Sequence, residues 1–97
     1  MNDVSFAWDE QKAVQNRRKH QVSFEEAMSV FWDENAIEYF DPDHSEKEDR
    51  FLVLGLSWHL RLLAVHYAVR EQGRQIRIIS ARKATKNEAR AYPWTRI

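Results

Sequence analysis

The chain has 97 residues, of which 43% are apolar and 31% charged, and its formal net charge is zero. Two glycines, two prolines and no cysteine exclude a low-complexity or collagen-like chain, a disulfide framework and a thiolate metal site or nucleophile. No apolar run approaches the ~20 residues of a membrane-spanning helix, and residues 1–12 lack the basic and apolar regions of a signal peptide. We expect a single domain over residues 1–97 that works in the cytoplasm without membrane contact.

The charges are divided between the two halves of the chain. Residues 1–49 hold five basic and thirteen acidic side chains, a balance of −8, whereas residues 50–97 hold ten basic and two acidic ones, a balance of +8. A fold that leaves the basic half on one face would attract phosphate groups, and the acidic half would repel and orient a polyanion. The alternative is that the two halves neutralise each other within the fold.

The first part of the chain predicts a short strand and a helix. Val4, Phe6 and Trp8 alternate with small residues, which is typical of a strand with one buried face. Asp9 is a suitable N-cap for a helix that ends near His20 and has only a narrow apolar stripe. Helical spacing places four polar side chains of this helix near one side, namely Lys12, Asn16, Lys19 and His20.

Ser23 begins the segment with the clearest helical pattern. Ser23 and Glu26 have the spacing of a capping box, and apolar residues then recur at helical intervals, at Phe24, Ala27, Met28 and Phe31. We expect a brief strand over residues 37–40, ended by Asp41 and Pro42 and followed by a polar, acidic loop.

Three further strands and a last helix are predicted in the basic half. The strands cover residues 50–57, 61–70 and 75–81, and short turns at 58–60 and 72–74 give the pattern of antiparallel hairpins. Alternation in the middle strand puts one set of residues on one face, Leu63, Val65, Tyr67 and Val69, and another set on the opposite face, Leu62, Ala64, His66, Ala68 and Arg70. Thr85 and Glu88 form a capping box that starts the last helix, with residues 82–84 as a link.

The expected fold class is therefore α+β. Two N-terminal helices and one C-terminal helix would pack on a mainly antiparallel sheet of four or five strands.

Arginines gather where the predicted strands begin and end. Arg50 begins one strand and Arg70 ends its neighbour, so an antiparallel hairpin brings them together, while Arg77 and Arg82 belong to the next strand and its exit. Guanidiniums match phosphate oxygens and stabilise the charge that develops in a phosphoryl transition state. The alternative for each arginine is exposure to solvent or pairing with a nearby acid such as Glu48.

The candidates for proton transfer are Glu88, Tyr92 and His66. Glu88 and Tyr92 are one helical turn apart, so a helix that turns this face to the sheet would place a carboxylate and a phenol near Arg82. The alternative is a capping glutamate and a packing tyrosine. His66 lies in mid-strand and is the best general acid or base among the four histidines. None of these histidines has metal-ligand spacing, and no glycine-rich phosphate loop occurs.

Four segments together carry a family pattern, namely FAWDEQKAVQNRRKHQVSFEEAMSVF, EKEDRFLVLGLS, RLLAVHYAVR and IRIISARKATKNEARAY. The matching residues are Trp8, Asp9, Lys12, Asn16, Lys19, His20, Phe24 to Ala27, Glu48, Arg50, Arg70, Ile78 to Thr85, Glu88 and Tyr92. On these residues the chain resembles the BrnT family of bacterial type II toxins over nearly its whole length. It departs from the family pattern at Gln21, where a glycine is expected, and at the turn 58–60, which is Trp-His-Leu instead of a glycine-bearing tip.

The resemblance implies a RelE-like fold and a metal-independent endoribonuclease that uses no cofactor and cuts RNA, free or on the ribosome. It also implies a BrnA-like antitoxin of ribbon-helix-helix type, through which alone the pair would bind operator DNA. The catalytic residues expected on this basis are Arg50, Arg70, Arg82, Glu88, Tyr92 and His66. The expected RNA-binding residues are Lys19, His20, Arg77, Lys83 and Lys86.

Two other functions stay open. A non-catalytic module that binds a ribbon-helix-helix partner is favoured by the zero net charge, which is low for a protein that must find RNA alone. A metal-dependent hydrolase using Asp41, Asp43 and His44 is less favoured, because these residues fall in a predicted loop without rigid support.

Overall fold

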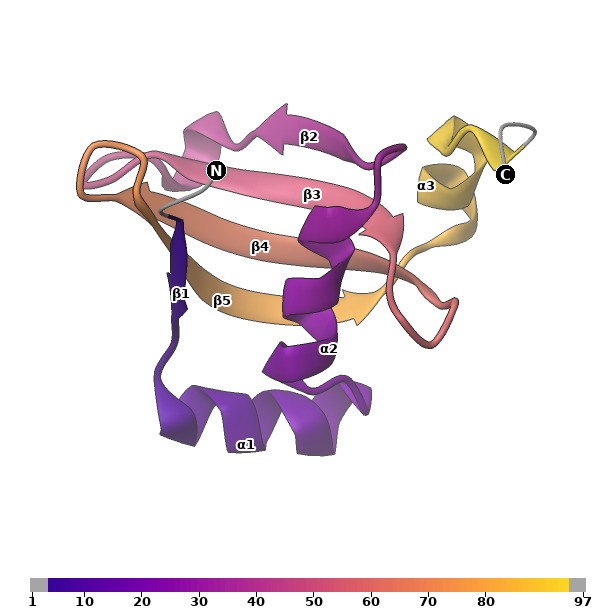
Figure 1. The fold of residues 1–97 in the computed structure, drawn as a ribbon, viewed down its shortest axis with the longest axis horizontal. Coiled ribbons are helices and arrows are strands. Elements are labelled where there is room, and N and C mark those ends of the chain that lie inside the picture. The colour runs from indigo at the N-terminus through magenta and orange to yellow at the C-terminus, as the bar shows by residue number, and fades with distance from the viewer. Residues whose placement is uncertain (1–3, 95–97) are drawn as a thin grey trace.

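Five strands form one sheet in the order β1-β5-β4-β3-β2. A computed structural model describes residues 4–94 and is drawn in Figure 1. The strands are β1 (Ser5–Ala7), β2 (Ile37–Phe40), β3 (Arg50–Leu56), β4 (Leu62–Arg70) and β5 (Gln75–Lys83). The helices are α1 (Glu10–His20), α2 (Phe24–Ser29) and α3 (Lys86–Ala91), with the 3₁₀ helices η1 (Val30–Trp32) and η2 (Pro42–His44).

The predicted α+β class is confirmed, and the sheet is antiparallel except at one edge. β2, β3, β4 and β5 pair as antiparallel neighbours, whereas β1 is parallel to β5, with Phe6 opposite Ile76. α1, α2 and three strands intervene between β1 and β5, which is enough chain for the long connection that a parallel pair needs.

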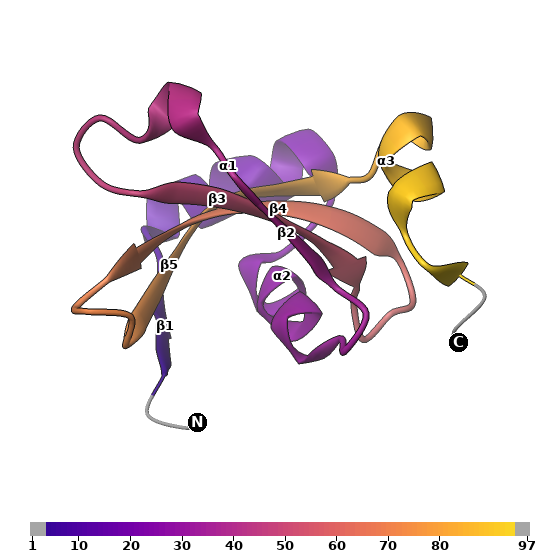
Figure 2. The same cartoon turned by 90° about the horizontal axis from the view of Figure 1, so that it is seen from above.

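The core lies between the sheet and α2. Val53, Val65 and Ile78 project from three strands onto Phe24 and Ala27 of α2, and all five side chains are buried. Figure 2 shows α2 on one side of the sheet, with the loop between β2 and β3 rising on the other side. The predicted alternation in β4 is confirmed, since Val65 lies in this core and His66 does not.

η1 approaches β3 so closely that position 55 requires a glycine. A Cβ atom on Gly55 would lie 2.8 Å from Val30 Cγ1 and 3.0 Å from Ala36 Cβ. The Asp33 carboxylate closes this contact, because its Oδ2 accepts a hydrogen bond of 2.8 Å from the Leu56 amide. η1 and the residues that follow it are therefore packed tightly against the end of β3.

α1 is joined to the β5 edge by one side chain. The carboxylate of Asp9 caps the helix by accepting from the amides of Gln11 and Lys12, as predicted. Asn16 is buried, and its amide donates to Ala81 O at 2.9 Å and accepts from Ala81 N at 3.1 Å. The same amide donates to Val22 O, so all three bonds tie α1 to β5 and to the start of α2.

Gln21 ends α1 in the left-handed conformation, with φ of 57°. A glycine would adopt this conformation without the steric cost that an L side chain meets, roughly 1–2 kcal/mol. Gln21, where the resemblance led us to expect a glycine, therefore keeps the helix exit in place and strains it locally.

Three element predictions need correction. The capping box at Ser23 is half formed, because Ser23 Oγ accepts from the Glu26 amide while the Glu26 side chain bonds Arg61 and Ser57. β5 continues through Lys83, since residues 82 and 83 pair with β4 and are not a link. The loop after β2 contains η2, which we did not expect because the segment is short and polar.

Removing the Asn16 amide should destabilise the fold. In Asn16→Ala, the buried amide and carbonyl of Ala81 lose their partners, which should lower the free energy of unfolding by about 3 kcal/mol. Urea denaturation followed by circular dichroism measures this change as a lower midpoint at an unchanged slope. The control is Gln15→Ala, which removes an exposed amide from the same helix. Equal midpoints for the two variants would contradict the role of Asn16.

Candidate active site

The sheet face opposite α2 carries most of the polar side chains that we predicted as site residues. We call this face the open face. Alternation places Arg50 of β3, His66 of β4 and Ser80 of β5 on this face, and the strand register puts His66 directly opposite Ser80. The loop of residues 41–49 rises on this side (Figure 2). Three strands and one loop therefore contribute to a common surface.

Three arginines meet at one carboxylate on the open face. Glu48 Oε2 lies 3.2 Å from Arg50 Nη2 and also accepts from Arg77 Nη2, while Glu48 Oε1 accepts from Arg70 Nε at 3.1 Å. The hairpin of β3 and β4 places Arg50 opposite Ala68, two residues from Arg70, and Arg77 also pairs with Ala68. The sequence prediction that hairpin pairing gathers Arg50 and Arg70 is confirmed, and Arg77 joins them. The alternative that these arginines pair with Glu48 is confirmed as well.

This arginine cluster has more positive than negative charge. Three guanidiniums share one carboxylate, a local balance of +2, and Arg77 Nε is buried without a hydrogen-bond partner. Burial alone would raise the pKa of Glu48, but hydrogen bonds from Arg70 and Arg50 and the charge of Arg77 outweigh burial and lower this pKa. Glu48 therefore stays ionised and holds the three guanidiniums together. The balance of +2 belongs to these four side chains alone, because Asp43 and Glu46 of the same loop lie next to Arg50.

Arg82 is held apart from this cluster by its own carboxylate. Its Nη1 and Nη2 donate to the two carboxylate oxygens of Glu88, at 2.8 and 2.9 Å. Glu88 also completes the capping box of α3 by accepting from the Thr85 amide, as predicted. The hydrogen bond from Arg82 is the main cause that lowers the pKa of Glu88 to about 2. Arg82 and Glu88 thus form a fixed ion pair at the α3 end of the sheet.

A hollow of about 250 Å³ lies beside the arginine cluster. Arg50 and His66 line it, together with Asp41, His44 and Ser80. The His44 Nδ1 atom lies 2.9 Å from Asp41 Oδ2, so the carboxylate orients this ring. Burial lowers the pKa of His66, and the charge of Arg82 lowers it further against the opposing charge of Asp41 and Glu88. His66 is therefore neutral near pH 7 and is able to accept a proton.

A second hollow of about 260 Å³ continues from the first toward α1. Lys12, Lys19 and His20 line its α1 side, and Ile79 and Ser80 belong to both hollows. The strand register shifts between His66 and Tyr67, which leaves Ile79 as the extra residue of a β-bulge. The bulge lies where the two hollows meet, and basic groups from α1 therefore border the same surface as His66.

The remaining predicted residues do not join this group. α3 ends at Ala91, so the expectation that Glu88 and Tyr92 share a helix face is wrong. Tyr92 is buried against Leu54 and Ala64, and its hydroxyl donates to Asp33 Oδ2 at 2.6 Å. Burial is the main cause that raises the pKa of Tyr92 to about 12. Lys83 faces away from the open face by alternation, and Lys86 is exposed in the first turn of α3.

Three residues of the first hollow are not among the predicted catalytic or RNA-binding residues, namely Asp41, His44 and Ser80. Asp41 and His44 are predicted only as metal ligands of the less favoured hydrolase, and Ser80 only as part of the family pattern. The spacing of Asp41 and His44 at i and i+3 could have indicated that the two side chains meet in a helical turn. η2 forms this turn, and the two side chains are in contact. Ser80 belongs to the family pattern, but its place beside His66 depends on the register that the bulge sets.

Residues 4–94 contain neither a cluster of metal ligands nor a membrane-spanning helix. Nowhere in this range do three His, Asp or Glu side chains come together in a way that could hold a metal ion. No helix in the described part of the chain is long and apolar enough to cross a membrane.

The structure thus defines a small α+β protein whose mainly antiparallel sheet carries arginines, an imidazole and a hollow on its open face. A family model described as the ribonuclease toxin BrnT of type II toxin-antitoxin systems matches residues 8–88. Because this match covers most of the chain, the protein belongs to the BrnT family of ribonuclease toxins.

A solved structure has the same fold. The crystal structure of the Brucella abortus ribonuclease toxin BrnT, determined at 1.1 Å resolution, superposes with a TM-score of 0.57. The two chains are 23% identical, and the match covers 86% of this chain and 99% of the Brucella chain. At this identity the likeness shows the fold alone. No protein with a curated description matches the chain.

Neutralising Glu48 should expose the excess charge of the arginine cluster. In Glu48→Gln, three neighbouring guanidiniums lose their common anion, which should lower the free energy of unfolding by about 1–3 kcal/mol at low salt. Inorganic phosphate should restore more stability to this variant than to the wild type, because it replaces the lost charge. Thermal unfolding over a phosphate series measures both effects. The exposed Glu46→Gln is the control, and a loss that phosphate does not reverse would contradict the cluster as an anion site.

Proposed function

We propose that the protein is an endoribonuclease that cleaves RNA without a metal ion, by attack of the ribose 2′-hydroxyl on the adjacent phosphodiester. The observation that carries the proposal is the hollow lined by His66, His44 and Arg50 beside an arginine cluster with a balance of +2. It offers a proton acceptor, a proton donor and cations within one surface. Family membership gives the reaction class, since BrnT proteins are ribonuclease toxins.

The arginine cluster binds the scissile phosphate in this proposal. As the 2′-oxygen bonds to phosphorus, negative charge grows on the equatorial oxygens, and guanidiniums stabilise it more in the transition state than in the ground state. Arg50 borders the hollow, while Arg70 and Arg77 are held beside it by Glu48. The fixed pair of Arg82 and Glu88 lies farther along the open face and suits a neighbouring phosphate of the strand.

His66 is the proposed general base. Its lowered pKa keeps the ring neutral at physiological pH, so it accepts the proton that leaves the 2′-hydroxyl as the new oxygen–phosphorus bond forms. The bond from phosphorus to the 5′-oxygen breaks, and that oxygen takes a proton from the acid. The products carry a 2′,3′-cyclic phosphate and a 5′-hydroxyl.

His44 is the proposed general acid. Its ring borders the same hollow as His66, and Asp41 orients it through the contact at Nδ1. Glu88 is a weaker candidate for proton transfer, because its pKa of about 2 leaves it ionised and bound to Arg82. The Tyr92 hydroxyl is occupied by Asp33, so Tyr92 supports the apolar end of the sheet in this proposal.

RNA beyond the scissile bond would follow the second hollow. Lys12, Lys19 and His20 present donors to the phosphate backbone there, and backbone contacts of this kind give affinity without sequence preference. We also propose that the neutralising partner is a BrnA-like antitoxin of ribbon-helix-helix type, which alone would bring the pair to operator DNA. Support for this partner comes from the family, whose toxins belong to type II toxin-antitoxin systems.

Cleavage should persist in excess chelator and depend on the 2′-hydroxyl. Purified protein with EDTA should convert an end-labelled RNA to fragments with cyclic phosphate ends, detected by electrophoresis before and after mild acid treatment. The same oligonucleotide with one 2′-deoxy substitution should resist cleavage at that linkage and be cut elsewhere. Cleavage at the substituted linkage would contradict the mechanism. Intact RNA with undiminished antitoxin binding would favour a non-catalytic module.

Loss of the His66 ring should slow the chemical step. His66→Gln should lower kcat by about 10²–10⁴-fold with little change in KM, because a glutamine keeps hydrogen bonding and cannot take the proton. In the wild type, the decline of kcat/KM on the acidic side should begin below the ordinary histidine pKa of 6.5, because the lowered pKa of His66 moves its protonation to more acidic pH. Single-turnover kinetics across pH measure both. The exposed His59→Gln is the control, and equal rates for the two variants would remove His66 from the site.

A further inference from the structure

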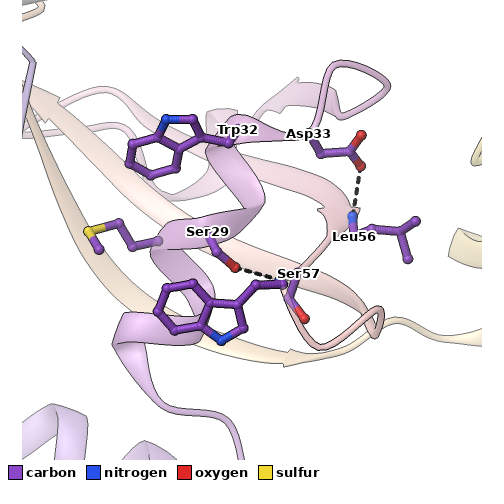
Figure 3. A pocket seen from close by; sticks show the side chains of 7 residues that line it. Ser29, Trp32, Asp33, Leu56 and Ser57 are labelled. Atoms are coloured by element: carbon purple, nitrogen blue, oxygen red, sulfur yellow. Dashed lines mark hydrogen bonds between the residues drawn. The ribbon is translucent and has the colours of Figure 1, made fainter.

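A groove of about 480 Å³ lies on the other side of the molecule from the open face. It lies between α2 and η1 on one side and the turn that joins β3 to β4 on the other, and Figure 3 shows Trp32 and Ser29 on the helical side and Ser57 on the side of the turn. Trp32 belongs to η1 and Trp58 to the turn, and Met28 adds apolar surface to the lining. Leu56 contributes its backbone amide here, since its side chain packs with Leu54 and Tyr92. The reaction proposed above uses none of these residues.

The two tryptophans are unusually exposed for their size. Trp32 is 66% exposed and Trp58 is 59% exposed, while most large apolar side chains of the molecule are buried or half-buried. Leu60 at the tip of the same turn is also exposed, so the apolar surface continues past the groove. Exposed tryptophans at the rim of a preformed groove are the features of a protein interaction site, where tryptophan is enriched among the residues that dominate binding energy.

Hydrogen bonds hold the groove open in its present shape. Ser29 Oγ accepts from the Trp58 amide at 3.0 Å, and Asp33 Oδ2 accepts from the Leu56 amide at 2.8 Å. Trp32 stacks on Phe6, with ring centroids 5.7 Å apart. Both walls are thus fixed before any partner arrives, which reduces the entropy that binding must overcome.

The charge around the groove is negative, which favours a basic partner. The segment 23–36, which forms one wall, holds four acidic residues and no lysine or arginine. Glu26 is buried and paired with Arg61, whereas Glu25 and Glu34 are exposed. Glu25 precedes Met28 and Ser29 by three and four residues, so helical spacing puts it on the groove side of α2. A polyanion such as RNA is repelled here, and a basic protein segment is attracted.

We propose that this groove is a docking site for the antitoxin, which inserts an apolar segment flanked by lysine or arginine between Trp32 and Trp58. The identity of the partner rests on the proposed function, whereas its chemistry rests on the groove itself. An amphipathic helix suits the site, because side chains at i, i+3 and i+4 reach the apolar floor while basic residues face Glu25 and Glu34. The antitoxin is then anchored on the face opposite the reaction site.

Titration of purified cognate antitoxin against toxin variants tests the proposal. Trp58→Ser should weaken binding about tenfold or more by isothermal calorimetry, and Glu25→Lys should weaken it more at low than at high salt. The matched controls are Phe40→Ser, an exposed aromatic outside the groove, and Glu71→Lys, an exposed acid in the β4–β5 turn. Both controls should bind as the wild type does. Thermal unfolding checks that each variant is folded, and Trp32→Ser supplies a second variant of the opposite wall.

RNA cleavage by the same variants separates this inference from the proposed function. Trp58→Ser should cleave RNA at the wild-type rate and resist neutralisation by the antitoxin. Wild-type antitoxin affinity in Trp58→Ser and Trp32→Ser would overturn the docking site whether or not RNA is cut. Loss of RNA binding instead would assign the groove to RNA, and loss of a toxin dimer in sedimentation would assign it to a second copy. A wild-type toxin that cuts no RNA would overturn the proposed function and leave the binding result intact.

Discussion

The amide of Asn16 bonded to the β5 backbone at Ala81 is the interaction on which the geometry of the open face depends. β1 pairs with β5 only as far as Arg77, so the edge of β5 beyond this point needs another partner. Asn16 supplies one donor and one acceptor there, as a neighbouring strand would, and a third bond holds the chain at Val22. These three hydrogen bonds hold α1 beside the bulge at Ile79. As a result, Lys19 and His20 line the same hollow as Ser80.

The opposite charges of the two halves are partly matched within the fold, and the remainder differs between its two sides. Glu48 and Glu26 of the acidic half pair with arginines of the basic half. In the arginine cluster on the open face, three guanidiniums share one carboxylate, so positive charge remains within the cluster, beside the acidic loop of residues 41–49. Around the tryptophan groove, Glu25 and Glu34 are exposed without a basic residue in their segment, so negative charge remains. The arginine cluster and the tryptophan groove thus differ in the sign of their local charge, and on this difference rest the proposed RNA site and the proposed antitoxin site.

The fold was predictable from sequence where the signals were local. Asp9 and Thr85 cap their helices as predicted, because a side-chain oxygen near free helix amides acts over three residues. Alternation also assigned the faces of β4 correctly, because side chains of a strand point to opposite faces at successive residues. The site was predictable only in part. Hairpin pairing indicated that Arg50 and Arg70 meet, but the roles of Tyr92 and Glu26 were decided by distant residues, Asp33 and Arg61.

The sequence by itself determined the α+β class, the family, the helix starts and the gathering of arginines at one end of a hairpin, because each of these follows from periodicity, capping or neighbouring-strand geometry. Only the tertiary structure decided that β1 runs parallel to β5, that a bulge turns Ser80 toward His66, and that His44 lines the same hollow. The physical reason is the distance along the chain over which each interaction acts. Local patterns fix torsion angles over a few residues, whereas these placements depend on contacts between segments far apart in the chain, whose energies no short pattern encodes.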